Sequence, residues 1–154
     1  MIVFLGEYEV TLDAKGRFLL PAGVKKQLPE DAGDSFVIAR GFEKCLTLYP
    51  KKNWDTILAE LSKVSEYKAE TREFLRYFTM GATLGELDSA GRLLIPPNLK
   101  AHAGLEKDVV LVSVINKIEI WDKSKYQQFF ESFTPEKYSD LAERVMGGSN
   151  PTQM

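Results

Sequence analysis

Cysteine and histidine are almost absent from this chain of 154 residues, which contains one of each. Cys45 has no second thiol for an internal disulfide and no His or Cys neighbour at metal-ligand spacing. It lies in an apolar run typical of a strand, so we interpret it as a buried packing residue. His102 has no second ligand near it, which favours a surface or helix-end position. We therefore expect no disulfide, no metal site and no cofactor.

Long hydrophobic runs are also missing. The apolar stretch at the N-terminus ends after five residues and follows no basic segment, which argues against a secretory signal peptide. No stretch is long enough to span a bilayer, so we expect a cytoplasmic protein without a membrane partner. Hydrophobic residues make up 44% and charged residues 27% of the chain, which is typical of a soluble globular protein rather than a disordered one.

The chain has no surplus of positive charge. Its 20 Lys and Arg residues face 22 Asp and Glu residues, for a formal net charge of -2. A surface that binds nucleic acid must therefore gather positive charge locally. The sequence also contains no glycine-rich phosphate loop, Walker lysine or metalloprotease motif.

An internal repeat organises the sequence. Residues 12–28 align with residues 87–103 at an offset of 75, with seven identities in seventeen positions. Further on, residues 46–49 match residues 118–121 at an offset of 72, and apolar residues at helical spacing follow both segments. Each half therefore carries the same order of elements.

The repeat predicts an α+β fold of two modules. We expect a first module with linker helices at residues 1–78, a second module at residues 79–146, and a disordered tail at residues 147–154. Strands are predicted over residues 7–12, 18–20, 36–39, 46–49 and 109–115, the last of them buried on both faces. Helices are predicted over residues 21–28, 51–65 and 70–80, and another begins at Thr134, an N-cap before Pro135.

The candidate site is a repeated Asp-x-x-Gly-Arg turn at residues 13–17 and 88–92. A carboxylate at the start of a turn accepts backbone N–H bonds, and glycine supplies the positive φ of a tight reversal. The arginine at the end of the turn presents a rigid fork of donors suited to phosphate oxygens and to the O6/N7 edge of guanine. A pseudo-twofold axis would aim both arginines at one surface. The alternative is a local ion pair that only shapes the turn, and both interpretations can hold together.

Lysines close to the turns in the sequence add modest positive charge. Ala90 stands where the first repeat has Lys15, so the first turn is the more basic of the two. Solvated surface lysines remain the alternative for Lys25, placed near Arg17, and Lys100, placed near Arg92. The predicted DNA contacts are Lys15, Arg17, Lys25, Arg92 and Lys100. The residues predicted to orient the turns are Asp13, Gly16, Asp88 and Gly91.

Equivalent aspartates in two repeats also suggest an enzyme, because pseudo-symmetric acid proteases pair two carboxylates. In this chain, Asp13 and Asp88 are not followed by the small hydroxyl-glycine turn that such a pair needs. The arginine four residues after each of them keeps the carboxylate ionised and opposes proton sharing. We therefore expect a protein that is not an enzyme.

Three groups of segments resemble the MraZ family over about residues 3 to 145. They are Leu-Gly-Glu-Tyr at 5–8, Leu-Asp-x-x-Gly-Arg-x-x-x-Pro at 12–21 and 87–96, and Arg-Glu-Phe-Leu-Arg-Tyr-Phe at 72–78 before Gly81-Ala82. The resemblance implies a bacterial transcriptional regulator of the division and cell-wall gene cluster, located in the cytoplasm and nucleoid. It also implies binding to short direct repeats in the promoter of its own operon. The family's Asp-x-x-x-Arg motif falls on Asp13 and Arg17, and on Asp88 and Arg92.

The resemblance further implies two AbrB-like swapped-hairpin repeats that form one pseudo-twofold β-barrel with flanking helices. Subunits are expected to assemble into ring homo-oligomers, octamers or dodecamers. Because the modules in a ring are linked, they bind successive DNA repeats with high effective concentration, which allows a protein that is acidic overall to bind DNA. The alternative, from a different class, is a structural ring or scaffold whose turns make subunit contacts.

Overall fold

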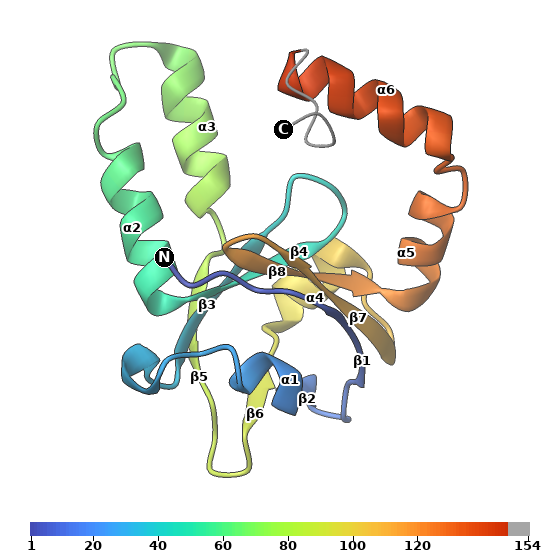
Figure 1. The fold of residues 1–154 in the computed structure, drawn as a ribbon. Helices are drawn as coiled ribbons and strands as arrows, with labels where there is room; N and C mark the ends of the chain where they lie inside the picture. Colours follow the sequence, from blue (N-terminus) through green and yellow to red (C-terminus); the bar gives the residue numbers. More distant parts are fainter. Residues whose placement is uncertain (148–154) are drawn as a thin grey trace. The chain divides into compact units, whose positions relative to one another are not determined.

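The computed structural model describes residues 1–147 and shows an α+β chain (Figure 1). The expected disordered tail lies outside these residues except for Gly147. The strands are β1 (Glu7–Thr11), β2 (Arg17–Leu19), β3 (Ser35–Arg40), β4 (Leu46–Pro50), β5 (Thr83–Glu86), β6 (Arg92–Leu94), β7 (Asp108–Val114) and β8 (Lys117–Asp122). The helices are α1 (Ala22–Lys25), α2 (Lys51–Leu61), α3 (Ala69–Thr79), α4 (Pro97–Ala103), α5 (Lys123–Phe130) and α6 (Pro135–Met146), with a short 3-10 turn, η1 (Glu30–Ala32).

All strand pairings in the described chain are antiparallel. Six strands form one sheet in the order β1-β7-β8-β4-β3-β5, and β2 pairs with β6 in a separate two-stranded ribbon. The α+β class is therefore confirmed. Within residues 1–147, β1 and β5 are the edges of the larger sheet, which is open rather than closed into a continuous barrel.

The two repeats exchange their first strands. β1 of the first repeat pairs with β7 of the second, and β5 of the second pairs with β3 of the first. The remaining pairs between repeats join equivalent strands, with Phe18 opposite Leu93 in the ribbon and Thr47 opposite Glu119 in the sheet. Each repeat therefore completes the sheet of the other, around a pseudo-twofold axis.

The main hydrophobic core takes equivalent side chains from both repeats. Its fully buried members include Phe18, Leu20, Leu46, Leu48, Leu93, Ile95, Ile118 and Ile120. Burying one such side chain contributes about 1.5–3 kcal/mol relative to leaving it exposed. Residues 1–123 form one compact unit around this core, so the strand pairing and the packing both make the repeats interdependent.

Residues from Ser124 onward form a second compact unit. Phe133 links its two helices, with ring centroids 6.0 Å from Phe130 and 6.4 Å from Tyr138. The predicted N-cap is confirmed, because the Thr134 hydroxyl accepts a hydrogen bond from Lys137 N at 3.1 Å. Among the described helices, none has both the length and the apolar character that crossing a membrane requires.

Several predicted boundaries were wrong. The helix expected to Ser65 ends at Leu61, and the helix expected over residues 21–28 covers only Ala22–Lys25. The segment expected to be buried on both faces is fully buried only at Val109–Leu111; residues 112–114 are half-buried and Ile115 is exposed. Apolar periodicity marks where side chains can pack, but it does not mark where the packing partner ends. His102 lies in the last turn of α4, as its predicted helix-end position requires.

Candidate nucleic-acid interface

The first Asp-x-x-Gly-Arg turn is closed by Asp13. Its Oδ1 accepts hydrogen bonds from Lys15 N at 3.0 Å and Arg17 N at 2.9 Å, while its Oδ2 accepts one from Arg17 Nε at 2.8 Å. Its carbonyl accepts a bond from Gly16 N at 3.0 Å. Gly16 has φ +83°, a conformation that favours glycine because it has no Cβ. One aspartate therefore fixes both the backbone of the turn and the direction of the arginine.

The second turn repeats this geometry almost atom for atom. Oδ1 of Asp88 accepts bonds from Ala90 N and Arg92 N, both at 2.9 Å, and its Oδ2 accepts one from Arg92 Nε, also at 2.9 Å. Gly91 has φ +80°. In both turns, the aspartate therefore bonds the backbone and the arginine, and the glycine has a positive φ.

Both aspartates are held in the ionised form. The backbone N–H of Arg17 is the largest influence and lowers the pKa of Asp13; desolvation, the next largest, raises it, while the Arg17 side chain and the Lys15 N–H lower it further. The pKa of Asp88 is lowered in the same way, first by the backbone N–H of Arg92. Two carboxylates that both favour ionisation are poorly suited to sharing a proton, as the pair of an acid protease does.

The ion pair leaves most donors of each guanidinium available. Arg17 and Arg92 use Nε for the aspartate, and within residues 1–147 their terminal nitrogens, Nη1 and Nη2, make no hydrogen bond. Their side chains are 26% and 37% exposed. The interpretation as a local ion pair and the interpretation as a presented fork of donors are therefore compatible.

Both arginines lie on the same face of the β2–β6 ribbon. Arg17 pairs with Leu94, and Arg92 pairs with Leu19. Because directly opposed residues share a face and successive residues alternate, these four side chains project together. Leu19 and Leu94 are 58% and 50% exposed, whereas Phe18 and Leu93, which alternate with them, are buried in the core. The predicted common surface for the two arginines is thus present in this ribbon.

The two turns are tied to each other across the repeats. Leu20 N donates to the carbonyl of Gly91 at 3.0 Å, and Ile95 N donates to the carbonyl of Gly16 at 2.9 Å. Each glycine therefore belongs to its own turn and also accepts a bond from the strand of the other repeat. This reciprocal bonding sets the spacing of the two arginines.

The lysines are placed differently from the sequence expectation. A Cβ on Gly91 would lie 2.6 Å from Lys25 Nζ, so Lys25 covers the turn of the second repeat. Lys100 lines a hollow with Asp13 and Ala14 and so lies beside the turn of the first repeat. The sequence placed each lysine with the turn of its own repeat. The antiparallel β2–β6 pairing instead sets Leu19, just before α1, opposite Arg92, and Leu94, just before α4, opposite Arg17, so each lysine lies beside the turn of the other repeat. Lys15 is exposed within the first turn.

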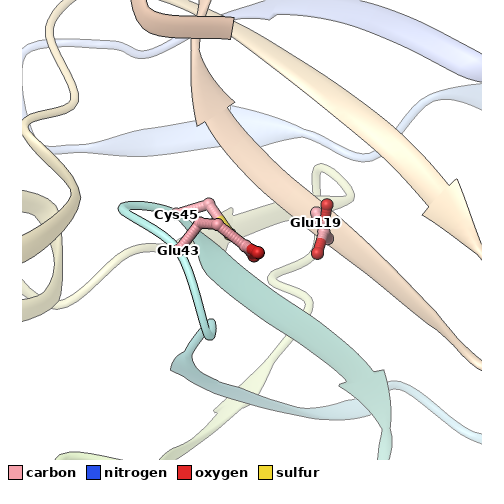
Figure 2. Close-up of side chains that lie close together, drawn as sticks. All are labelled: Glu43, Cys45 and Glu119. Carbon is pink, nitrogen blue, oxygen red and sulfur yellow. The ribbon is translucent and has the colours of Figure 1, made fainter. Parts of the chain in front are cut away.

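A second group of polar side chains was not found from the sequence. One ligand atom each of Glu43, Cys45 and Glu119 lies within 4.8 Å of the others (Figure 2). Cys45 is fully buried, and burial, followed by the charges of Glu119 and Glu43, raises the pKa of its thiol to about 12. Cys45 is therefore protonated at neutral pH, and its prediction as a buried residue is confirmed. The sequence signal that could have brought Cys45 and Glu119 together is the repeat. It aligns residues 46–49 with residues 118–121, the segments that form β4 and β8, which pair in the structure.

The fold and the site together define a class of α+β proteins in which two strand-exchanged repeats each carry an arginine held by an aspartate. Residues 3–77 and 78–147 each match the MraZ protein family, described as antitoxin-like, and the chain belongs to that family. The family resemblance drawn from the repeated motif is thereby confirmed.

Three relatives, each named "Transcriptional regulator MraZ", match almost the whole chain. The protein of Christiangramia forsetii is 44% identical over 97% of both chains. That of Flavobacterium psychrophilum is 41% identical over 97% of this chain and 96% of its own, and that of Cytophaga hutchinsonii is 44% identical over 93% and 94%. The similarity therefore extends through both repeats.

Proposed function

We propose that this protein is a transcriptional regulator that binds duplex DNA through its two Asp-x-x-Gly-Arg turns. The observation that carries the proposal is the geometry of the arginines. Arg17 and Arg92 share one face of a ribbon, and each is fixed through Nε by an aspartate that leaves its terminal nitrogens unbonded within the described chain. The names of the relatives support the same function.

Fixing an arginine through Nε prepares it for bidentate recognition. A guanidinium offers five N–H donors in a plane, and its terminal nitrogens match two phosphate oxygens or the O6 and N7 atoms of guanine. Holding it in place before binding reduces the side-chain entropy lost on forming the complex. A two-stranded antiparallel ribbon also fits the major groove of B-DNA. Lys15, Lys25 and Lys100 would supply further contacts to phosphate.

We further infer an AbrB-like swapped-hairpin arrangement from the exchange of β1 and β5, with the two sheets in place of a closed barrel. Its modules would be residues 1–78 and 79–146. In this proposal the protein acts in the cytoplasm and nucleoid on direct repeats in the promoter of the division and cell-wall gene cluster. Several linked copies would compensate for the few basic groups in each chain, because linking raises the effective concentration of every further contact.

An apolar hollow supports the proposed assembly into rings of eight or twelve copies. Aromatic side chains from α3 and the β3–β4 loop line it, among them Phe42, Phe74 and Tyr77, which are 80%, 42% and 53% exposed. Charged groups of both signs, including Arg40 and Glu73, also line it. An exposed apolar surface bordered by charges is typical of protein–protein contact sites.

The test is DNA binding by Arg17→Ala and Arg92→Ala variants, measured by fluorescence anisotropy on the duplex upstream of the protein's own gene at two salt concentrations. Losing a base-contacting arginine costs about 1–3 kcal/mol, so affinity should fall at least about tenfold for the double variant. Arg76→Ala is the matched control, because it removes the same charge from an exposed position on α3. Unchanged binding by the double variant would contradict the proposal.

The same variants separate the regulator from the scaffold alternative. The Arg17→Ala variant should keep the oligomeric state of the parent protein, measured by light scattering after gel filtration, although it binds DNA more weakly. A scaffold whose turns make subunit contacts would instead lose assembly. Arg17→Lys keeps the charge but removes the planar fork, so a large loss with lysine indicates bidentate recognition rather than charge alone.

A further inference from the structure

The two turns have matching geometry but different charge. At the third position of the turn, the first repeat has Lys15 and the second has Ala90. Both residues are exposed, and both donate their backbone N–H to the aspartate of their own turn. The backbone role is therefore kept in both repeats, while the ammonium group is present in only one of them.

A second difference lies in the residue of the other repeat that each turn approaches, just before β7 at the first turn and just before β3 at the second. Leu12 N donates to the carbonyl of Lys107 at 2.9 Å, and the equivalent Leu87 N donates to the carbonyl of Asp34 at 3.0 Å. Lys107 and Asp34 thus occupy equivalent places under the pseudo-twofold axis, and both are exposed. At this place the charge is reversed, positive beside the first turn and negative beside the second.

The surroundings of each turn follow the same trend. Besides Asp13, the charged residues that line the hollow at the first turn are Lys100, Lys107 and Glu106. Besides Asp88, those that line the hollow at the second turn are Lys25, Glu30 and Asp34. The first group has a net positive charge and the second a net negative charge. A DNA phosphate would therefore be attracted more strongly to the first turn.

The contacts within the chain give these two charges no structural role. Among residues 1–147, the side chains of Lys107 and Asp34 form neither an ion pair nor a hydrogen bond. Because exposed charges are screened within about 8 Å at physiological ionic strength, they act mainly on a ligand that binds at the adjacent turn.

We propose that the two turns are unequal: the turn at residues 13–17 dominates DNA binding, with Lys15 and Lys107 contacting phosphate, while Asp34 weakens the turn at residues 88–92. This inference rests on the proposed function. Lys107 comes from the second repeat, so the dominant contact is built from both repeats. Each lysine that neutralises a phosphate releases counterions and adds about 0.9 to the slope of log affinity against log salt.

The first experiment compares single variants of the full chain on the duplex upstream of its own gene. Arg17→Ala should weaken binding at least about threefold more than Arg92→Ala when both variants are measured at the same salt concentration. Lys107→Ala should weaken binding and lower the salt slope by about one, whereas Asp34→Ala should strengthen it. Lys68→Ala, which removes an exposed lysine before α3, should change neither value.

A charge-exchange variant tests the inference without altering the net charge. It combines Lys15→Ala with Ala90→Lys, and Lys107→Asp with Asp34→Lys, all at exposed positions. In this background Arg92→Ala should cost more affinity than Arg17→Ala, the reverse of the order in the parent protein. Equal effects of the two arginines in the parent, or an order that the exchange does not reverse, would overturn the inference.

Failure of this inference is distinct from failure of the proposed function. If both arginine variants weaken binding equally, the protein binds DNA through both turns and only the inequality is wrong. If neither variant weakens binding in either background, the turns do not contact DNA and both proposals fail. Circular dichroism and light scattering on every variant check that fold and assembly are unchanged.

Discussion

Single residues in the turns combine two functions, closing the backbone of the turn and orienting the arginine. The Asp13 carboxylate closes a backbone turn and orients a guanidinium with the same two oxygens. The spacing of four residues predicts this arrangement, because aspartate at the start of a turn accepts nearby N–H groups. The positions of Lys25 and Lys100 could not be predicted in the same way, since their neighbours depend on which strands pair.

The pH dependence of stability provides a test at this scale. The folded protein lowers the pKa of Asp13 and Asp88 below the ordinary value of 3.8. Their contribution to stability is therefore present above that value and is lost as pH falls through the lowered pKa of the folded state. The free energy of unfolding of an Asp13→Asn, Asp88→Asn variant, measured with urea between about pH 2 and pH 6, should depend less on pH below about pH 4 than that of the parent.

The control for this measurement is Asp55→Asn, which removes an exposed aspartate that pairs with Lys51 on α2 and holds no turn. The Asp55→Asn variant should show the same dependence of the free energy of unfolding on pH as the parent, and so the same difference from the double variant. Parallel curves for the parent and the double variant would show that the turns do not stabilise the ionised aspartates.

Among the elements, strands were predicted more accurately than the lengths of helices. Alternation and short apolar runs located β1, β3, β4 and β7, because each strand has one or two faces in the core. Helix α2 ends earlier than its apolar spacing suggests, and Val64, beyond its end, is 43% exposed. The strand partners of β1 and β5 were not evident from periodicity, which carries no information about pairing.

Helix α6 offers a prediction at the element scale. Thr134 caps it by accepting from Lys137 N, so Thr134→Ala should destabilise the helix by about 1 kcal/mol. Hydrogen exchange of the first-turn amides, including Lys137 and Tyr138, should become about five times faster. Ser139→Ala, an exposed change inside the same helix, should not accelerate exchange, because alanine has the higher helix propensity. Equal exchange in Thr134→Ala and the parent would show that the cap contributes nothing.

At the scale of the molecule, the repeat in the sequence predicted two equivalent halves but not their exchange of strands. The alignment at an offset of 75 identified both turns, and a further alignment of residues 34–40 with residues 107–113 would have identified Lys107 and Asp34. The exchange itself is set by non-local pairing between β1 and β7 and between β3 and β5, for which the composition of one strand gives no rule.

The proposed ring makes a prediction about DNA geometry. Subunits linked in one assembly should contact promoter repeats on the same side of the duplex, spaced near its helical period of about 10.5 base pairs. Inserting about half a turn between the repeats should weaken binding strongly, whereas inserting a whole turn should restore part of it. Anisotropy titrations of the three duplexes provide the measurement. Equal affinity for all three would contradict simultaneous binding by linked subunits.

Covalent joining of the two halves has a consequence for how such a protein can change. In an assembly of two identical chains, every substitution appears twice, so both recognition turns must change together. Here one gene encodes two separately mutable copies within a shared set of strands, and Lys107 can differ from Asp34 without disturbing the backbone bond that each provides. Fusion thus allows one half to specialise while the other continues to support the architecture.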